Sequence, residues 1–362
     1  ISRIDRSIKK ATSQVLHTSY KNVLKDFMIY NQRQFLQDNR GRRQVVRGLP
    51  VVVKQTTQQH DFYRFYPRPV TRGRDYAYVE FKHGIYRVLL YQGFYKPTVL
   101  YKGGVRQLKT QINPNYPLIA WDPKGSRLAV LYEKSGKLEL MVYDIISRTK
   151  VILPMPFESV NSMQYMLNYN TLLLSAIKNG HTDIYTYNVS TYKATQITHD
   201  VYDDLNPTFV AFPKKSGIIY SSNRPSPTAA SSDTVLPHNH YNIFLVDDWD
   251  NASERQITQL TNMKRGDARL PMQYNDTYFT FVSNENGITN RYAGFFQSQA
   301  AGADSLVYVG ETILHNPDQQ ELDSTLASYG SQQPDSVKVI AITKDSTYVF
   351  PITNYSFGIA ES

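Results

Sequence analysis

The order of apolar and polar residues divides the chain into a short helical start and a long body of strands. Apolar side chains recur at three- and four-residue steps between residues 6 and 37, which predicts helix there. Thr18 or Ser19 is expected to cap a second helix that begins near Tyr20, and the DNRGRR segment, Asp38 to Arg43, is expected to end it. A helical hairpin of this size cannot bury its apolar stripe alone, so we expect it to dock on the body or on a part that this sequence lacks.

After Gln44 the helical period disappears, and short apolar runs alternate with Gly, Pro, Asn and Asp residues. The runs come in sets of four, and each set starts at a proline or a polar residue. The starting residues are Pro67, Pro117, Ser162, Pro207 and Pro271. A repeat of about 40–50 residues with four strands in each unit is typical of a β-propeller. The longest step between starts contains a Pro- and Ser-rich loop, Pro225–His240.

The repeat also predicts the blade boundaries. Four blades are well formed and a fifth is more divergent, at about residues 114–160, 161–204, 205–265, 266–314 and 44–105 respectively. The runs SVKVIAI and STYVFPI near the carboxyl end predict part of a sixth blade. The predicted fold class is therefore all-β, a six-bladed β-propeller with an N-terminal α-helical segment.

Two domains are expected. Residues 1–43 form a helical segment with a basic linker, and residues 44–362 form the propeller, whose completeness at the C-terminus is left open. The polar stretch Gln297–Asp335 predicts long loops around one strand, Ser305–Leu314. The chain begins at Ile1 with no visible signal peptide, so we interpret it as a fragment or a processed product.

Composition and charge narrow the chemistry. The chain has no Cys, which excludes disulfides, thiolate metal sites and a Cys nucleophile. No apolar run approaches the ~18–20 residues that a membrane helix needs. The net charge of +9 lies in residues 1–55, which hold 12 basic and 3 acidic residues, while the rest of the chain is neutral. The body is therefore not a polyanion binder by charge, and no nucleic-acid partner is expected.

An acidic turn is the first candidate site. In ITHDVYDDLNPTF the acids Asp200, Asp203 and Asp204 lie close together, and oxygen ligands at this spacing suit a hard cation such as Ca²⁺. Asp residues also cap turns through hydrogen bonds to their own backbone. A structural corner between two strands is the preferred interpretation, and a Ca²⁺ site is the alternative.

The histidines offer a second candidate. His238 and His240 would point the same way on a strand and, with Asp233, would suit a transition metal. They lie in the Pro- and Ser-rich loop, which favours a solvated loop instead. The sequence contains neither a G-x-S-x-G elbow nor an H-E-x-x-H motif. We assign no catalytic residue and expect no cofactor.

Arginines provide the candidate partner contacts. Arg224 and Arg291 follow equivalent strands, where they either meet a partner protein at a rim or channel or tie neighbouring blades together through Asp residues. The basic run Asn39–Gly48 is either a solvated linker or a contact for anionic lipid, lipopolysaccharide or an acidic partner. Its first arginines are Arg40, Arg42 and Arg43.

Three segments resemble the blade signature of TolB-like (WD-type) propellers. They are QITHDVYDDLNPTF…IIYSSNR, IAWDPKGSRLAVLYEKSGKLELMVYDI and DARLPMQ…FTFVSNENGITNRY, and the resemblance covers roughly residues 60–295. The chain departs from the signature where its Asp-Gly turn is replaced, at Leu167–Asn170 and Phe212–Gly217. The helical start resembles the segment that ends a zinc-peptidase-like domain and precedes such propellers in envelope proteins of Bacteroidetes-type bacteria.

The resemblance implies an envelope protein, periplasmic or outer-membrane associated. In this interpretation the propeller is a non-enzymatic protein-interaction scaffold, because propeller loops present contacts on a rigid framework. The alternative is a substrate-selecting or gating propeller domain of a larger hydrolase or zinc-peptidase-like enzyme. A third hypothesis is a carbohydrate- or peptide-binding module that uses a Tyr-rich face.

Overall fold

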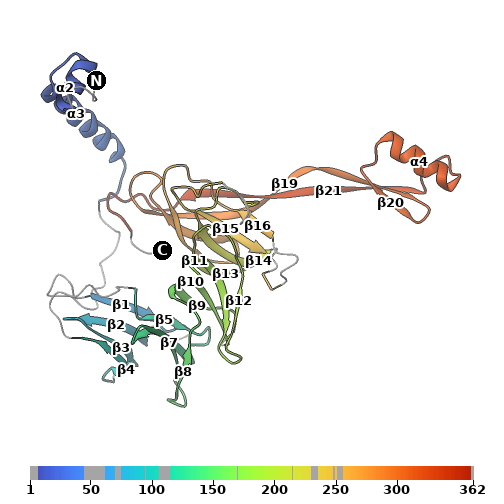
Figure 1. Ribbon diagram of the computed structural model, residues 1–362. Helices are drawn as coiled ribbons and strands as arrows, with labels where there is room; N and C mark the ends of the chain where they lie inside the picture. Colours follow the sequence, from blue (N-terminus) through green and yellow to red (C-terminus); the bar gives the residue numbers. More distant parts are fainter. Residues whose placement is uncertain are drawn as a thin grey trace.

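The computed structural model describes residues 7–44, 62–69, 75–93, 95–105, 115–168, 170–213, 215–229, 235–247, 249–250 and 256–359. The described strands form five antiparallel sheets, and in each sheet four strands follow one another in chain order (Figure 1). Four-stranded antiparallel sheets that succeed one another along the chain are the blades of a propeller. The all-β fold class predicted from the repeat is confirmed.

Each sheet coincides with one predicted blade. The first sheet contains β1 (Phe62–Pro67), β2 (Tyr76–Lys82), β3 (Ile85–Tyr91) and β4 (Thr98–Gly104). The second contains β5 (Leu118–Trp121), β6 (Arg127–Lys134), β7 (Lys137–Asp144) and β8 (Lys150–Pro154). The third contains β9 (Ser159–Tyr165), β10 (Thr171–Lys178), β11 (His181–Asn188) and β12 (Lys193–Gln196). The fourth contains β13 (Asp204–Phe212), β14 (Lys215–Ser222), β15 (Asn242–Asp247) and β16 (Gln256–Gln259). The fifth contains β17 (Ala268–Gln273), β18 (Tyr278–Ser283), β19 (Asn290–Val309) and β20 (Thr312–His315).

The core lies between successive sheets. Separate apolar clusters fill the junctions from the first sheet through to the fifth. Strands inside a blade are covered on both faces, so Leu172, Leu173 and Leu174 of β10 are all fully buried. Burial on both faces explains why these strands read as continuous apolar runs rather than as alternating ones.

Two of the repeated prolines, Pro207 and Pro271, lie in bulges of the first strands of their blades. Between Leu205 and Thr208 of β13 the register with β14 shifts by one residue, and the same shift occurs in β17. Pro207 and Pro271 occupy these bulges, where proline's missing N–H is tolerated. The proline carbonyl accepts a hydrogen bond from the preceding blade, as from Thr208 Oγ1 to the Pro271 oxygen at 2.8 Å. The predicted starting residues therefore link blades.

The predicted sixth blade is not confirmed. SVKVIAI and STYVFPI belong to one strand, β21 (Ser336–Pro351), which pairs with β19 of the fifth sheet. The prediction of long loops over Gln297–Asp335 is wrong for the same reason, because β19 continues to Val309. Residues such as Gly, Ala, Gln and Ser have little strand propensity, and the pairing partner lies far along the chain, so the sequence pattern concealed this strand.

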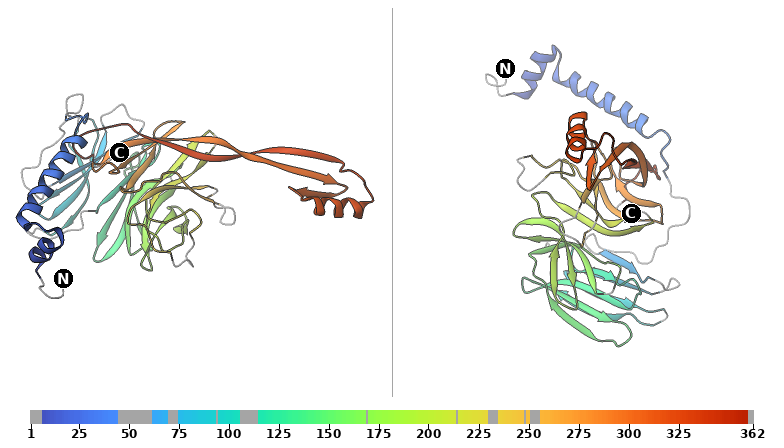
Figure 2. Two further views of the ribbon diagram at one scale, coloured as in Figure 1. Left: turned by 90° about the horizontal axis from the view of Figure 1, so that it is seen from above. Right: turned by 90° about the vertical axis from the view of Figure 1, so that its right-hand side faces the viewer.

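β19 and β21 leave the fifth sheet as a long two-stranded arm that projects from the body (Figure 2). Helix α4 (Gln319–Tyr329) and β20 form the tip of the arm. The tip has a small core of its own, made of Val307, Val309, Leu314 and Leu326. Gly310 turns with a φ of 57°, and the Tyr329 ring occupies the space that a side chain there would need. The tip is thus a folded module.

The helical start is built as predicted but does not dock. α2 (Ile8–Leu16) and α3 (Tyr20–Asp38) follow one another, and the Ser19 hydroxyl caps α3 by accepting a bond from the Asn22 N–H at 3.2 Å. Neither helix contains a buried residue, and Figure 2 shows them apart from the sheets. Of the two alternatives expected, packing on the body is not seen for the described residues, and docking on a part outside this sequence stays a prediction. None of the helices described is long and apolar enough to cross a membrane.

Candidate functional site

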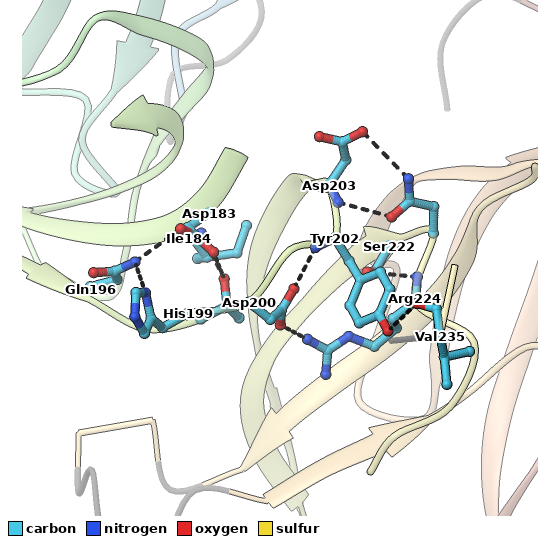
Figure 3. A network of polar contacts seen from close by, with 12 residues as sticks. Asp183, Ile184, Gln196, His199, Asp200, Tyr202, Asp203, Ser222, Arg224 and Val235 are labelled. Carbon is cyan, nitrogen blue, oxygen red and sulfur yellow. Dashed lines mark hydrogen bonds and ion pairs between the residues drawn. The ribbon is translucent and has the colours of Figure 1, made fainter. Parts of the chain in front are cut away.

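The acidic turn closes the junction between the third and fourth sheets (Figure 3). Asp200 lies after β12, Asp204 begins β13, and Asp183 joins them from β11. One carboxylate oxygen of each lies within 4.8 Å of the others. Asp203, which the sequence grouped with Asp200 and Asp204, lies outside this carboxylate cluster. Its backbone N–H donates instead to Asn223 Oδ1 at 2.8 Å.

The carboxylate cluster is buried. Asp183, Asp200 and Asp204 are 1%, 8% and 0% exposed. Arg224, which follows β14, is 1% exposed and forms an ion pair with Asp200. Of the two roles that the sequence left open for Arg224, the structure shows the link between blades. A guanidinium buried in this way is not available to a partner protein at the surface.

Two of the three carboxylates are held by hydrogen bonds. Asp200 Oδ1 accepts from the Tyr202 N–H at 2.9 Å, and Asp183 Oδ2 accepts from Gln196 Nε2 at 2.9 Å. The hydroxyls of Thr198 and Ser222 lie beside Asp204 and lower its pKa. Within hydrogen-bond distance, neither Asp204 oxygen has a partner among the described residues.

Burial governs the electrostatics of the cluster. It raises the pKa of Asp204 to about 8, with Asp200 raising it further and Arg224 opposing the rise. Burial and the charge of Asp200 together raise the pKa of Asp183 to about 6. The pKa of Asp200 is also raised by burial, against the attraction of Arg224. Three carboxylates in a low-dielectric space resist carrying three negative charges at once.

The histidine pair gathers no third ligand within the described residues. The His238 and His240 rings stack with centroids 5.1 Å apart, and His240 Nδ1 lies 3.0 Å from Asn239 Oδ1. Asp233, the proposed third ligand, lies outside the described residues. The transition-metal interpretation stays a prediction.

The remaining arginines occupy two different settings. Arg291 lines a hollow of about 580 Å³ on the outer face of the fifth sheet, together with Tyr274, Tyr278 and Phe350. In the basic linker, Arg40 is exposed, whereas Arg42 Nη2 donates to the Asn286 oxygen at 2.9 Å.

The backbone of Arg43 pairs with the C-terminal segment. Its N–H donates to the Asn354 oxygen at 2.8 Å, and its oxygen accepts from the Ser356 N–H at 3.0 Å. The linker is therefore fastened to the fifth sheet and to the chain that follows β21.

Sequence reasoning missed Asp183. It lies on β11, 17 residues before Asp200, so local spacing in the sequence does not reveal the contact. A signal was present nonetheless. Asp183 opens DIYTYN, Asn242 opens NIFLVD and Asn290 opens NRYAGF, which are equivalent third strands of successive blades. Aligning these three strands would have marked a charged residue at a position that is an amide in the next two blades.

Comparison with known proteins finds similarity to solved structures only. No family model and no curated protein matches the chain. TolB from Acinetobacter baumannii is 14% identical over 61% of this chain, with a TM-score of 0.43, and the chain spans 48% of that protein. The β-propeller domain of the trilobed protease from Pyrococcus furiosus is 12% identical, covering 63% of this chain and 82% of that domain, with a TM-score of 0.35. Dipeptidyl peptidase 4 of Porphyromonas gingivalis is 11% identical, covering 78% and 49%, with a TM-score of 0.41.

The matched structures include TolB and other β-propellers. The origin in Bacteroidetes-type bacteria stays an expectation from sequence.

Proposed function

We propose that the protein is a non-enzymatic interaction scaffold in a bacterial cell-envelope assembly, periplasmic or outer-membrane associated. The arm formed by β19 and β21 carries this proposal. The body contributes little stability to a two-stranded arm that projects away from it, and two strands alone are only marginally stable in water. An arm that ends in a folded module is instead suited to reach a second protein.

The surface of the arm tip supports a protein contact. Ile313, Tyr329, Val337 and Val339 are large apolar residues that lie exposed at the tip. Apolar side chains gathered on one small module are typical of an interaction surface. The proposed occupant is a partner protein of the same assembly that offers an apolar surface to the tip.

Site-specific photocrosslinking tests the arm. A photoreactive amino acid is placed at Val337 or Val339 in the full-length protein, and the cells are irradiated before their envelopes are isolated. We expect one discrete crosslinked species from both tip positions, containing the same envelope protein. Ile146, which is 84% exposed on the turn after β7, serves as the control position and should give no such species.

Two results would contradict the scaffold. One is the absence of any product from the tip, and the other is an identical product from the tip and from Ile146. A crosslink to a peptide substrate of an adjoining domain would favour the alternative, a substrate-selecting propeller of a larger hydrolase.

We also propose that the helical segment, residues 7–44, contacts an anionic lipid surface. Its side chains combine exposed apolar residues with a strong excess of basic ones. Phe27, Met28 and Phe35 are 62%, 70% and 62% exposed. This segment contains eight Lys and Arg residues but two Asp residues. A helix with an apolar face and basic flanks binds in the interface of an anionic membrane.

Vesicle sedimentation tests the lipid contact. The protein should sediment with phosphatidylglycerol vesicles and stay in solution with phosphatidylcholine vesicles. The triple variant Lys21→Glu, Lys25→Glu, Arg33→Glu should reduce binding at least tenfold, since each basic residue near such a surface contributes about 1 kcal/mol. A matched triple variant on the propeller, Lys124→Glu, Lys137→Glu, Lys193→Glu, should bind as the wild type does. Equal losses from both variants would reject the assignment.

A further inference from the structure

The junction between the fourth and fifth sheets is an internal comparison for the carboxylate cluster. Ser222 of β14 pairs with Asp204, and Ser283 of β18 pairs with Ala268, so Ala268 is the counterpart of Asp204. Two residues before each serine, Tyr220 corresponds to Phe281. The next junction thus carries an apolar residue at both positions.

The other half of the cluster differs in the same way. Thr198 accepts from the Ile184 N–H at 2.9 Å, and Thr261 accepts from the Ile243 N–H at 2.8 Å, which makes Asn242 the counterpart of Asp183. Two residues after each threonine, Asp200 corresponds to Met263.

At the equivalent corners, neutral asparagines accept the hydrogen bonds that hold the chain after the fourth strand. Asn242 Oδ1 accepts from the Met263 N–H at 2.7 Å and from Thr261 Oγ1 at 3.0 Å. Asn290 of the fifth sheet repeats this pattern, accepting from the Tyr355 N–H at 2.7 Å and from Thr353 Oγ1 at 3.0 Å. The corner of a blade therefore needs an amide oxygen and no carboxylate. Asp183 Oδ1 also accepts the threonine bond, from Thr198 Oγ1 at 3.4 Å, but the corner does not need its charge. The negative charge of the cluster therefore serves something other than the corner.

The cluster has unclaimed oxygen atoms, and it carries excess negative charge once all three carboxylates are ionised. Three ionised carboxylates and the Arg224 guanidinium leave two negative charges without a counter-charge. The Tyr220 hydroxyl is fully buried and, like both Asp204 oxygens, has no hydrogen-bond partner among the described residues. Tyr220 and Ser222 lie on the same face of β14, and Ser222 pairs with Asp204, so the hydroxyl belongs to the cluster. Buried polar atoms of this kind are normally satisfied.

We propose that Asp183, Asp200 and Asp204 bind one divalent cation, Ca²⁺, that fastens the third blade to the fourth. Ca²⁺ takes oxygen ligands at about 2.3–2.6 Å, so opposed ligands lie about 5 Å apart, and the three carboxylates here lie within 4.8 Å. The cluster contains oxygen atoms and neither imidazole nor thiolate, which favours Ca²⁺ over zinc. Two positive charges balance the excess, and Arg224 keeps Asp200 in place. This Ca²⁺ site does not depend on the arm or on the lipid contact.

Thermal unfolding of the full chain tests the Ca²⁺ site. The protein is prepared in EDTA and melted with added CaCl₂, MgCl₂ or KCl. We expect CaCl₂ at 100 times its Kd to raise Tm by about 3–5 °C, and KCl to have no such effect. Elemental analysis after removal of free ions should find one Ca²⁺ per chain.

Asp204→Ala is the decisive variant, because it installs the residue that the next junction already carries. It should fold, keep its Tm in EDTA within a few degrees of the wild type, and lose the Ca²⁺-dependent shift. Asp267→Asn, at the counterpart of Asp203 in the next junction, should keep the full shift. No Ca²⁺ on the wild type, or a full shift in Asp204→Ala, would overturn the proposal. Asp183→Asn provides a second test, since Asn242 shows that the amide fits.

Discussion

Replacing Arg224 with methionine is expected to lower the free energy of unfolding by about 3–5 kcal/mol, because it leaves buried carboxylates without their counter-charge. The guanidinium is fully buried and pairs with Asp200. It also lies over the Phe244 ring at 5.6 Å, so its loss affects packing as well as charge. Urea unfolding in EDTA measures the effect without any contribution from bound cations.

A double-mutant cycle separates charge from packing. Asp200→Asn combined with Arg224→Met should cost less than the sum of the two single changes, because neither partner is then left charged and buried. Arg127→Met is the surface control. Arg127 Nε lies 3.6 Å from Asp144 with its side chain 33% exposed, and its replacement should change stability by about 0–1 kcal/mol. Equal costs for Arg224→Met and Arg127→Met would refute the interpretation.

Replacing Phe279 with alanine is the second large expected effect, at about 3–5 kcal/mol. Phe279 is fully buried between the fourth and fifth sheets, with its ring centroid 6.1 Å from that of Phe281 and 5.9 Å from that of Phe296. Gly294 lies beneath it on β19, and the ring fills the space that a side chain at 294 would need. The arm starts from this strand, so the packing also anchors the arm.

A complementary substitution tests the fit of ring and glycine. Gly294→Val should destabilise the wild type by about 1–3 kcal/mol through overpacking. In the Phe279→Ala background the added side chain fills part of the cavity, so the double variant should be more stable than Phe279→Ala alone. Urea unfolding of the four proteins measures this. Additive costs would show that the two positions do not share one space.

The repeat made the blades predictable from the sequence. The arm could not be predicted, because its strands pair over a long range. Strand sets starting at Pro117, Pro207 and Pro271 appear in the sequence because each blade is built from neighbouring residues. Those prolines were expected to start the sets of strands, and the structure places Pro207 and Pro271 within the bulged first strands. The arm escaped prediction because β19 pairs with residues far along the chain and is polar where it leaves the body.

Only half of the candidate site could be predicted from the sequence, for the same reason. Asp200 and Asp204 share one turn, so their spacing showed them together. Asp183 and Arg224 come from other strands, and only folding brings them to the turn. Asp203 lies outside the carboxylate cluster, since residues that are adjacent in sequence point to opposite faces where a strand begins.

The proline bulges also bear on aggregation. The first strand of every blade is the edge of its sheet, and an exposed edge is a template onto which another chain can add. At Pro207 and Pro271 that edge lacks an N–H, and the carbonyl is already taken by Gln164 or Thr208 of the preceding blade. These edges therefore offer few free hydrogen-bonding groups to an incoming strand at the two prolines. The residues that protect the edges are the same ones that join the blades.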